Sequence, residues 1–250
     1  MIILIFLYAL LLGSFFNVVG LRVPVNQSIV KPRSACSHCH RTLSAMELIP
    51  VFSYLIQGGK CRHCKGRLSP LYPLGELITA ILFVFSYEQI GWNFEVIIAW
   101  TLISLIIIIF ISDIAYMIIP DKILLVFTGI FFIERFLSPL DPWWDSLLGG
   151  AIGFLLLLAI AFVSKGGMGG GDIKLFGVLG FVLGLKSVLL SFFLATLFGA
   201  VVGIIGMKLG SFKKGKPIPF GPFIGLGALV TYFYGQIIID WYLSLLTLLY

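Results

Sequence analysis

Long apolar runs separated by short polar segments make up almost the whole chain. A helix that crosses a bilayer needs about 20 apolar residues, with a range of roughly 17–25. Runs of about this length recur along the sequence, although the fourth is somewhat short and the sixth is shorter still. The predicted fold class is therefore an all-α polytopic membrane protein with about eight transmembrane helices. These helices are expected over residues 1–20, 71–88, 96–112, 123–137, 147–164, 173–185, 187–207 and 221–243.

The composition agrees with a membrane protein, because 60% of the residues are hydrophobic and only 11% are charged. A soluble domain of this size needs more charge on its surface. The first apolar run has no basic residue before it and no cleavage site of small residues after it. We therefore expect a retained first helix and not a signal peptide.

The basic residues predict an orientation. If the N-terminus is outside and every segment crosses, the inner loops hold 15 of the 17 Lys and Arg residues, leaving only Arg135 and Lys186 outside. This distribution follows the positive-inside rule, and it is broken if residues 173–185 do not cross. The basic loops, chiefly 22–70 and 208–216, would also meet an anionic inner leaflet favourably. No folded basic module surrounds them, so we expect no nucleic-acid partner.

Two aspartates stand at the ends of apolar segments. Asp113 follows the run AWTLISLIIIIFIS, and Asp172 follows KGGMGGG. The predicted topology places both at the cytoplasmic membrane level. Two carboxylates within hydrogen-bonding reach share a proton, so that one can activate water while the other protonates the leaving group. The sequence thus predicts an aspartic-protease pair, with Asp121, in a polar loop after Pro120, as a poorer candidate.

Simpler interpretations of these residues remain open. Asp113 could mark a helix end at the interface, and Asp172 could cap a helix N-terminus. The glycines before Asp172 could form a plain loop, but they are more numerous than a turn needs. We expect a backbone, including that of a substrate, to approach them closely. The glycines concerned are Gly169, Gly170 and Gly171.

All four cysteines of the chain lie in the first polar segment, as CSHC and CRHC. A loop in the reducing cytosol should not hold disulfides, so a metal site is the natural alternative. Four thiolates suit a closed, tetrahedral structural zinc site, which would stabilise a loop with little core. A redox pair and a mixed site using His38, His40 or His63 are the alternatives. The predicted ligands are Cys36, Cys39, Cys61 and Cys64.

Five ordered blocks carry a resemblance to a known family. GGGD at 169–172 fits the G-x-G-D signature of membrane aspartyl proteases, and ISDIAYMIIPDKI at 111–123 is similar to the first-aspartate segment of bacterial type IV prepilin peptidases. GSFFNVVGLRVP at 13–24, KPIPFGPFIGLGAL at 216–229 and the block at 47–80 are similar to further segments of that family. The chain resembles these enzymes over nearly its whole length.

The resemblance implies an endopeptidase that cleaves the leader peptides of prepilins or pseudopilins, with Asp113 and Asp172 as catalytic residues. It places the protein in the bacterial cytoplasmic membrane, with the catalytic face cytoplasmic and the N-terminus outside. It also implies N-methylation of the new amino terminus, with S-adenosylmethionine as donor, although no glycine-rich nucleotide loop is visible. Glu76 matches a family segment and is a candidate cofactor contact; its alternative is an interfacial acid paired with a nearby arginine.

The predicted domains are a first transmembrane helix (1–21), a cytoplasmic cysteine loop associated with methyl transfer (22–70) and a peptidase membrane domain (71–250). A transporter or channel, in which the two aspartates bind a cation or relay protons, is the alternative function. That alternative leaves the cysteine loop unexplained.

Overall fold

The computed structural model describes residues 1–165, 167–210 and 218–248. Regular structure in this part of the chain is helical, with two isolated β-bridges in the cysteine loop. The expected all-α fold is confirmed. Gly166 and the predicted inner-loop lysines Lys213, Lys214 and Lys216 lie outside the described residues.

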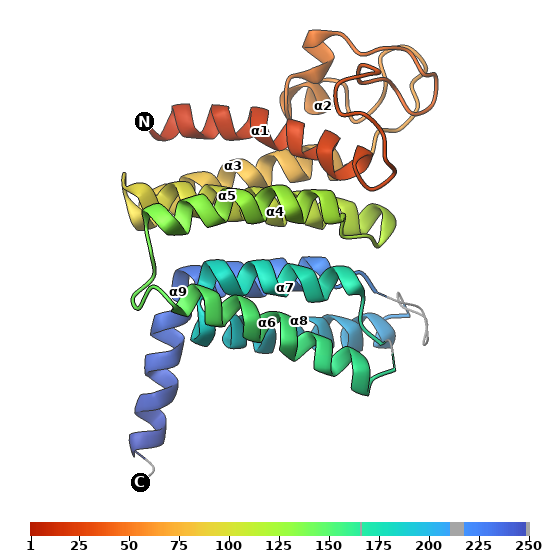
Figure 1. Cartoon of the computed structure of the whole chain (residues 1–250). Helices are drawn as coiled ribbons and strands as arrows, with labels where there is room; N and C mark the ends of the chain where they lie inside the picture. Colours follow the sequence, from red (N-terminus) through yellow and green to blue (C-terminus); the bar gives the residue numbers. More distant parts are fainter. Residues whose placement is uncertain (166, 211–217, 249–250) are drawn as a thin grey trace. The chain divides into compact units, whose positions relative to one another are not determined.

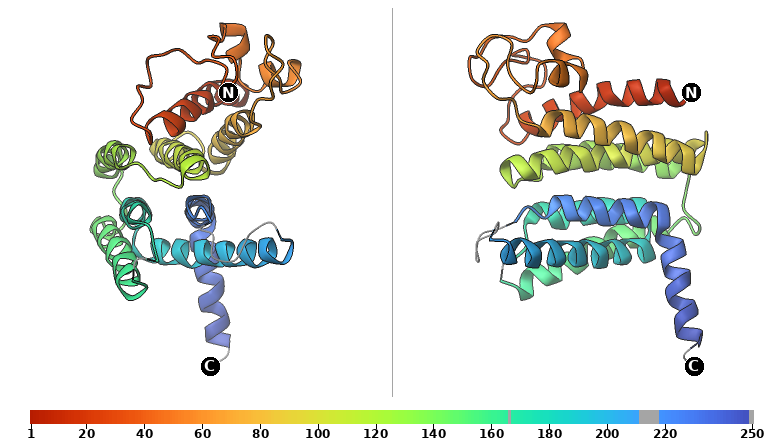
Figure 2. Two further views of the ribbon diagram at one scale, coloured as in Figure 1. Left: turned by 90° about the vertical axis from the view of Figure 1, so that its right-hand side faces the viewer. Right: turned by 180° about the vertical axis from the view of Figure 1, so that it is seen from behind.

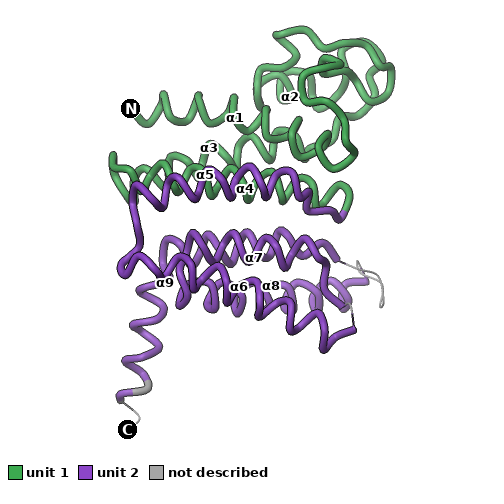
Figure 3. The backbone as a smooth tube through the Cα atoms, viewed as in Figure 1, with its two compact units in different colours: residues 1–116 green, residues 117–250 purple. Residues whose placement is uncertain are grey.

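The chain forms two compact units, residues 1–116 and 117–250 (Figure 3). The helices of unit 1 are α1 (Ile2–Arg22), the 3-10 helix η1 (Ala45–Leu48), α2 (Phe52–Ile56), α3 (Leu71–Ile90) and α4 (Phe94–Tyr116). Those of unit 2 are α5 (Asp121–Leu137), α6 (Asp145–Val163), α7 (Gly170–Leu183), α8 (Leu185–Lys208) and α9 (Gly221–Leu248). This division reflects packing, whereas the predicted domains reflect activities, so the three-domain organisation stays a prediction.

In unit 1, small residues bring α1 against α3 and α4 (Figure 1). A Cβ added to Gly13 would lie 2.7 Å from the Cα of Glu76, and one added to Gly20 would lie 2.9 Å from the Cβ of Ile111. Close backbone approach of this kind is how membrane helices associate without a hydrophobic driving force. The segment between α1 and α3 carries the cysteines and covers the end of α1 and the start of α3 (Figure 2).

In unit 2, α6 and α7 pack through glycines. A Cβ on Gly149 would overlap the carbonyl oxygen of Gly180, and one on Gly153 would lie 2.6 Å from that of Phe176. The spacing of Gly149 and Gly153 is the G-x-x-x-G pattern of tightly packed membrane helices. Because α7 carries Asp172, this contact fixes the helix on which a predicted catalytic residue stands.

Arg135 is one of the two basic residues predicted outside, and the structure gives it a packing role. Its side chain is buried, and its Nε and Nη2 donate to the carbonyl oxygen of Val182, over 3.1 and 2.8 Å. The guanidinium thus ties α5 to the last turn of α7, where the helix dipole favours a cation. It is a packed structural group and not a free loop charge.

Each of the eight predicted segments coincides with a helix, but six of these helices are long and apolar enough to span a membrane, by length and composition within the described residues. The other two are α5, with 17 residues, and α7, with 14. At 1.5 Å per residue they reach about 25 and about 21 Å, less than a hydrocarbon core of about 30 Å. The count of eight spans therefore stays a prediction.

Candidate functional site

Asp113 lies in the last turn of α4, with 6% of its surface exposed. The helix ends at Tyr116, and the following residue Met117 has a positive φ of 55° before the chain reaches Pro120. The neighbours Ile111 and Ser112 are fully buried. A carboxyl held in the packed end of a membrane helix is costly, and such residues are usually functional.

Asp172 is the third residue of α7, whose N-cap is Gly169. Asp172 is therefore an acid of the first helical turn, where the helix dipole favours a negative charge, and not the cap itself. Its carboxylate folds back over the cap, because a Cβ added to Gly169 would lie 3.0 Å from Oδ2.

The glycines before Asp172 have separate structural reasons. Gly170 and Gly171 form the first turn of α7. A Cβ on Gly171 would lie 2.7 Å from the Cβ of Ile119, so this glycine lets the segment before α5 pack against α7. Gly170 has no described atom within 4 Å of such a Cβ, so it faces open space beside Asp172.

Asp113 belongs to unit 1 and Asp172 to unit 2. Their pairing stays a prediction. Asp121, the third acid considered, forms an ion pair of 2.7 Å with Nζ of Lys174, in which both side chains are largely exposed. A neighbouring cation gives this carboxylate a partner within unit 2.

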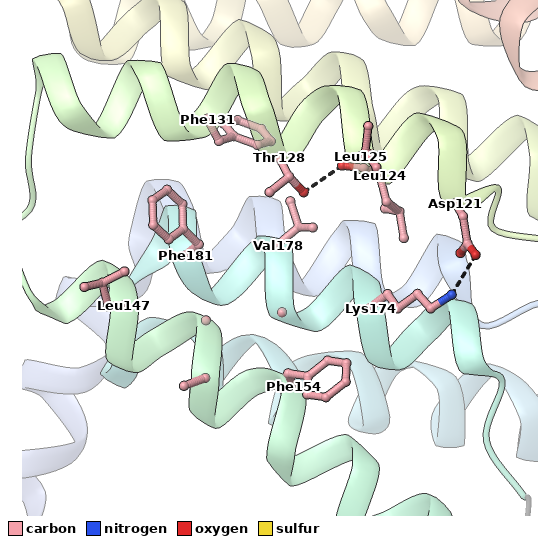
Figure 4. A pocket seen from close by; sticks show the side chains of 13 residues that line it. Asp121, Leu124, Leu125, Thr128, Phe131, Leu147, Phe154, Lys174, Val178 and Phe181 are labelled. Atoms are coloured by element: carbon pink, nitrogen blue, oxygen red, sulfur yellow. Dashed lines mark hydrogen bonds and ion pairs between the residues drawn. The ribbon is translucent and has the colours of Figure 1, made fainter.

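An apolar groove of about 580 Å³ runs along α5, α6 and α7 (Figure 4). Gly150 and Gly177 leave it open on the α6 and α7 sides, and the ion pair of Asp121 and Lys174 lies at one end. Lys174 follows Asp172 by two residues on α7. The groove therefore begins close to the predicted catalytic acid of unit 2. Its apolar lining includes Leu124, Leu125, Phe131, Leu147, Phe154, Val178 and Phe181.

The structure brings the four cysteines together, with their sulfur atoms within 4.8 Å of one another. The Sγ atoms of Cys36 and Cys64 are 3.8 Å apart. A tetrahedron with metal–sulfur bonds of about 2.3 Å has sulfur–sulfur edges of about 3.8 Å. The cluster could therefore hold a metal ion, and its spacing fits four thiolate ligands.

The two C-x-x-C turns have the same local structure. The N–H of His40 donates to the carbonyl of Cys36 over 2.9 Å, and the N–H of Lys65 donates to that of Cys61 over 3.0 Å. His40 and Lys65 have positive φ values of 56° and 57°. Antiparallel bridges between residues 35 and 42 and between residues 60 and 67 close the two turns.

Backbone N–H groups in these turns point at the sulfurs. The N–H groups of Cys39 and His38 lower the pKa of Cys36 to about 7, and those of Cys64 and His63 lower the pKa of Cys61. These donors favour the thiolate form, which is the form that binds metals, at Cys36 and Cys61. At Cys64 the N–H of Gly66 lowers the pKa, but burial and the neighbouring thiols raise it to about 11.

The histidines are not part of this group. Among the described residues, the four thiols form the cluster that could hold a metal. Nε2 of His38 is 3.0 Å from the carbonyl oxygen of Arg67, so its ring connects the two turns. A Cβ on Gly66 would lie 2.7 Å from that ring, which is why the second turn has a glycine here.

Glu76, the candidate cofactor contact, is 7% exposed on α3. Its Oε2 accepts a hydrogen bond of 2.7 Å from the N–H of Val51, and the Ser14 hydroxyl is a second partner. The alternative interpretation of Glu76 expected an arginine partner, but its partners in the described part of the chain are Val51 and Ser14. The contact of Val51 with Glu76 was not predicted, because no sequence pattern indicates that a valine will have a φ of 60°.

Comparisons with known proteins agree with this organisation. Residues 7–90 match the bacterial peptidase A24 N-terminal domain, and residues 100–204 match the type IV leader peptidase family. The chain is 45% identical over 245 residues to the prepilin leader peptidase/N-methyltransferase of Bacillus subtilis (strain 168), covering 98% of this chain and 99% of that protein. No solved structure matches.

Two further relatives with the same description are less similar to this chain. The protein of Aeromonas salmonicida (strain A449) is 32% identical over 277 residues, covering 96% of this chain and 93% of that protein. That of Pseudomonas aeruginosa is 30% identical over 270 residues, covering 95% and 92%. This chain belongs to the type IV leader peptidase family, which confirms the resemblance found in its sequence. The transporter alternative is not supported.

Proposed function

We propose that this protein is a membrane aspartic endopeptidase that removes the leader peptides of type IV prepilins or pseudopilins and N-methylates the new amino terminus. Similarity over nearly the full length to relatives described as prepilin leader peptidase/N-methyltransferase carries this proposal. The two matched domains support an assignment of both activities to one chain.

Asp113 and Asp172 would act as one catalytic pair that shares a proton. The ionised carboxylate takes a proton from a water molecule, whose oxygen attacks the scissile carbonyl. The protonated carboxyl hydrogen-bonds the carbonyl oxygen and then donates its proton to the leaving amine. The burial of Asp113 and the first-turn position of Asp172 support these roles, because each side chain is held by the helix that carries it.

The glycines beside Asp172 would admit the backbone of the substrate. Gly170 supports this role, because the space beyond its Cα is open in the described structure. The apolar groove on the same helix would receive the hydrophobic segment that follows the leader in the precursor. Its apolar lining, carried in part by the helix that holds Asp172, suits a substrate in which a polar leader joins an apolar helix.

The cysteine cluster would hold zinc in a structural role. Cys36, Cys39, Cys61 and Cys64 would supply four thiolate ligands to the ion, which is the closed ligand set of a structural zinc site. The ion would contribute folding free energy to residues 22–70, which contain only two short helices, η1 and α2.

The protein would lie in the bacterial cytoplasmic membrane, with its N-terminus outside and its catalytic face cytoplasmic. The positive-inside distribution of the basic residues supports this orientation. Under it, residues 1–21 form the first span, 22–70 the cytoplasmic cysteine loop and 71–250 the peptidase domain, with the basic loops against anionic lipid.

A single reaction tests both activities. The purified protein in detergent is mixed with a synthetic precursor that has a basic leader, a glycine junction and an apolar helix, with and without S-adenosylmethionine. Mass spectrometry should find cleavage at the junction in both reactions, and a methyl group on the new amine only when the methyl donor is present. Absence of cleavage would overturn the peptidase assignment, and cleavage without methylation would overturn the methyltransferase assignment alone.

A further inference from the structure

Unit 1 contains a cavity of about 380 Å³ where the end of α1, the start of α3 and the end of α4 meet the cysteine loop. Arg22, Tyr72 and Tyr116 contribute to its wall from these three helices, and Tyr54 does so from α2. Its volume falls within the range of roughly 300–1,000 Å³ that is usual for small-molecule sites. The cavity and all of its lining belong to one compact unit.

Two buried polar side chains, Asn17 and Glu76, belong to the wall of the cavity. Asn17 is 4% exposed; its Nδ2 donates to the carbonyl oxygen of Tyr72 over 3.0 Å, while its Oδ1 has no hydrogen-bond partner in the described structure. The carboxylate of Glu76 has the Val51 N–H and the Ser14 hydroxyl as its partners, and neither is a cation. Asn17 Oδ1 is inaccessible and faces Gly75 of α3. The group that points to a ligand is therefore the buried Glu76 carboxylate, because a buried charge favours an opposite charge as its partner.

The loop over Glu76 is held in a strained conformation. Val51 has φ 60° and ψ −53°, which is unfavourable for a β-branched residue. Its N–H donates to Glu76, so the carboxylate holds the strained turn from which α2 starts. Strain that the surroundings enforce clusters at functional sites and ligand clamps. Tyr54, one turn further along α2, is thereby positioned at the cavity.

The wall also connects the cavity to the proposed cleavage site. Tyr116 lies three residues after Asp113 on α4. Residues at this spacing share a helix face, with Cβ atoms about 5–6 Å apart. An amino terminus released at Asp113 would therefore lie about one helical turn from the cavity.

The ligand that these groups fit has three features. A carboxylate and tyrosine rings favour a cation, the rings also favour an aromatic base, and the Arg22 guanidinium favours a carboxylate. We infer that this cavity binds S-adenosylmethionine, whose sulfonium, adenine and amino-acid groups combine these features. The inference rests on the proposed methyltransferase function and assigns the site that serves it.

Methyl transfer at this site balances without a further reactant. The lone pair of the neutral new amine forms a bond to the methyl carbon as the carbon–sulfur bond breaks. The electron pair of that bond stays on sulfur, which becomes a neutral thioether, and the methylated ammonium releases one proton to solvent. Glu76 would bind the cationic donor and would not need to take up that proton.

Binding of S-adenosylmethionine labelled in its methyl group tests the assignment by equilibrium dialysis on the full chain in detergent. Glu76→Gln removes the charge but keeps an oxygen for the Val51 N–H, and Glu88→Gln is the matched control on the exposed far end of α3. We expect binding to weaken by about tenfold or more in Glu76→Gln, which corresponds to about 1.4 kcal/mol. Glu88→Gln should bind as the unmodified protein does. Equal binding by Glu76→Gln would overturn the inference.

A second pair of variants tests the cavity itself. Ser53 lines the cavity on α2, whereas Leu55 on the same helix is 66% exposed and does not line it. Ser53→Tyr should abolish binding by filling the space, while Leu55→Tyr should leave it unchanged. Thermal unfolding and metal content, measured on each variant, identify any that fail to fold.

Ultraviolet crosslinking of the same labelled donor locates the site directly. The label should appear in peptides that contain Tyr54 or Tyr72. Label confined to residues 117–250 in a protein that cleaves and methylates the precursor would overturn the site and leave the proposed function intact. Absence of both binding and methylation in a protein that cleaves would overturn the methyltransferase function and this site together.

Discussion

Single residues carry most of the chemistry proposed for this protein, and the surroundings of its three candidate acids differ. Asp113 is packed into the last turn of α4, Asp172 stands in the first turn of α7, and Asp121 is exposed in an ion pair with Lys174. Exposed pairs contribute little, because solvent screens the attraction and two side chains must be ordered. These differences favour Asp113 and Asp172 as the reacting acids.

The first prediction concerns the ion pair. Asp121→Asn should change the free energy of unfolding by less than about 1 kcal/mol, because solvent screens the pair: 50% of the Lys174 side chain and 68% of the Asp121 side chain are exposed. Thermal denaturation in detergent measures this, with Lys174→Gln as the complementary variant. A loss of several kcal/mol in either variant would show that the pair is shielded and structurally important.

The second prediction concerns the metal cluster. Cys36→Ser should lower the zinc content, because it removes one of four thiolate ligands. Elemental analysis of the purified protein measures this, and Ser37→Ala in the same turn is the control. Removal of the metal by a chelator should expose residues 22–70 to proteases. Unchanged zinc content in Cys36→Ser, or unchanged proteolysis after chelation, would contradict the four-cysteine structural site.

At the level of elements, glycine determines how closely the helices approach. Gly149 on α6 and Gly180 on α7 bring the backbones of the two helices into direct contact. Gly177, three residues before Gly180 on α7, borders the groove. The same residue type therefore serves close packing at one position and open space at another.

These two roles predict opposite results for the same substitution. Gly180→Ala should destabilise the protein by about 1–3 kcal/mol or more, because its Cβ would overlap the Gly149 carbonyl group. Gly177→Ala should be nearly neutral, because its Cβ would lie 3.4 Å from the Cβ of Phe154, an ordinary contact. Thermal unfolding of both variants measures the two effects. Equal effects would show that α6 and α7 do not approach more closely at Gly180 than at Gly177.

The apolar runs and their lengths predicted the helices well, but the exact ends of the helices depend on tertiary contacts. The sixth segment was expected over residues 173–185, and α7 spans Gly170–Leu183. A plain loop was one open interpretation of Gly170 and Gly171, and glycine has low helix propensity, but the structure places both in the first turn of α7. Packing of Gly171 against Ile119 outweighs that propensity, and Gly184, with φ 83°, ends the helix.

The cysteine loop was predictable in chemistry and not in structure. The two C-x-x-C motifs predicted which four side chains come together, because their residue types and spacing are specific. The shared structure of the two C-x-x-C turns depends instead on positive φ values at His40 and Lys65, and neither residue type predicts such a value. The contact between Glu76 and Val51 joins residues 25 positions apart and has no local pattern at all.

At the scale of the whole molecule, six helices satisfy the length and composition of a span, and the positive-inside count favours eight crossings. The two shorter helices, α5 and α7, decide between these possibilities. Both pack against each other, and α7 carries Asp172. The side of the membrane on which Asp172 lies therefore depends on whether α5 and α7 cross it.

Cysteine labelling in intact cells measures the topology. A membrane-impermeant maleimide should react with Trp92→Cys and Trp143→Cys, both highly exposed positions in loops predicted outside, and with Lys186→Cys. It should not react with Met117→Cys, which is predicted inside. Reaction at position 117 with none at position 92 would reverse the orientation, and protection at position 143 would show that α5 does not cross.

The most direct measurement of the central proposal is the rate of precursor cleavage by purified Asp113→Asn and Asp172→Asn. Asn keeps the size of each side chain but cannot exchange the proton that the pair must share. General acid–base groups contribute about 10²–10⁴-fold, so each variant should lose at least about 100-fold in rate, while Asp121→Asn keeps most of its activity. Full activity in either Asp113→Asn or Asp172→Asn would contradict the paired mechanism.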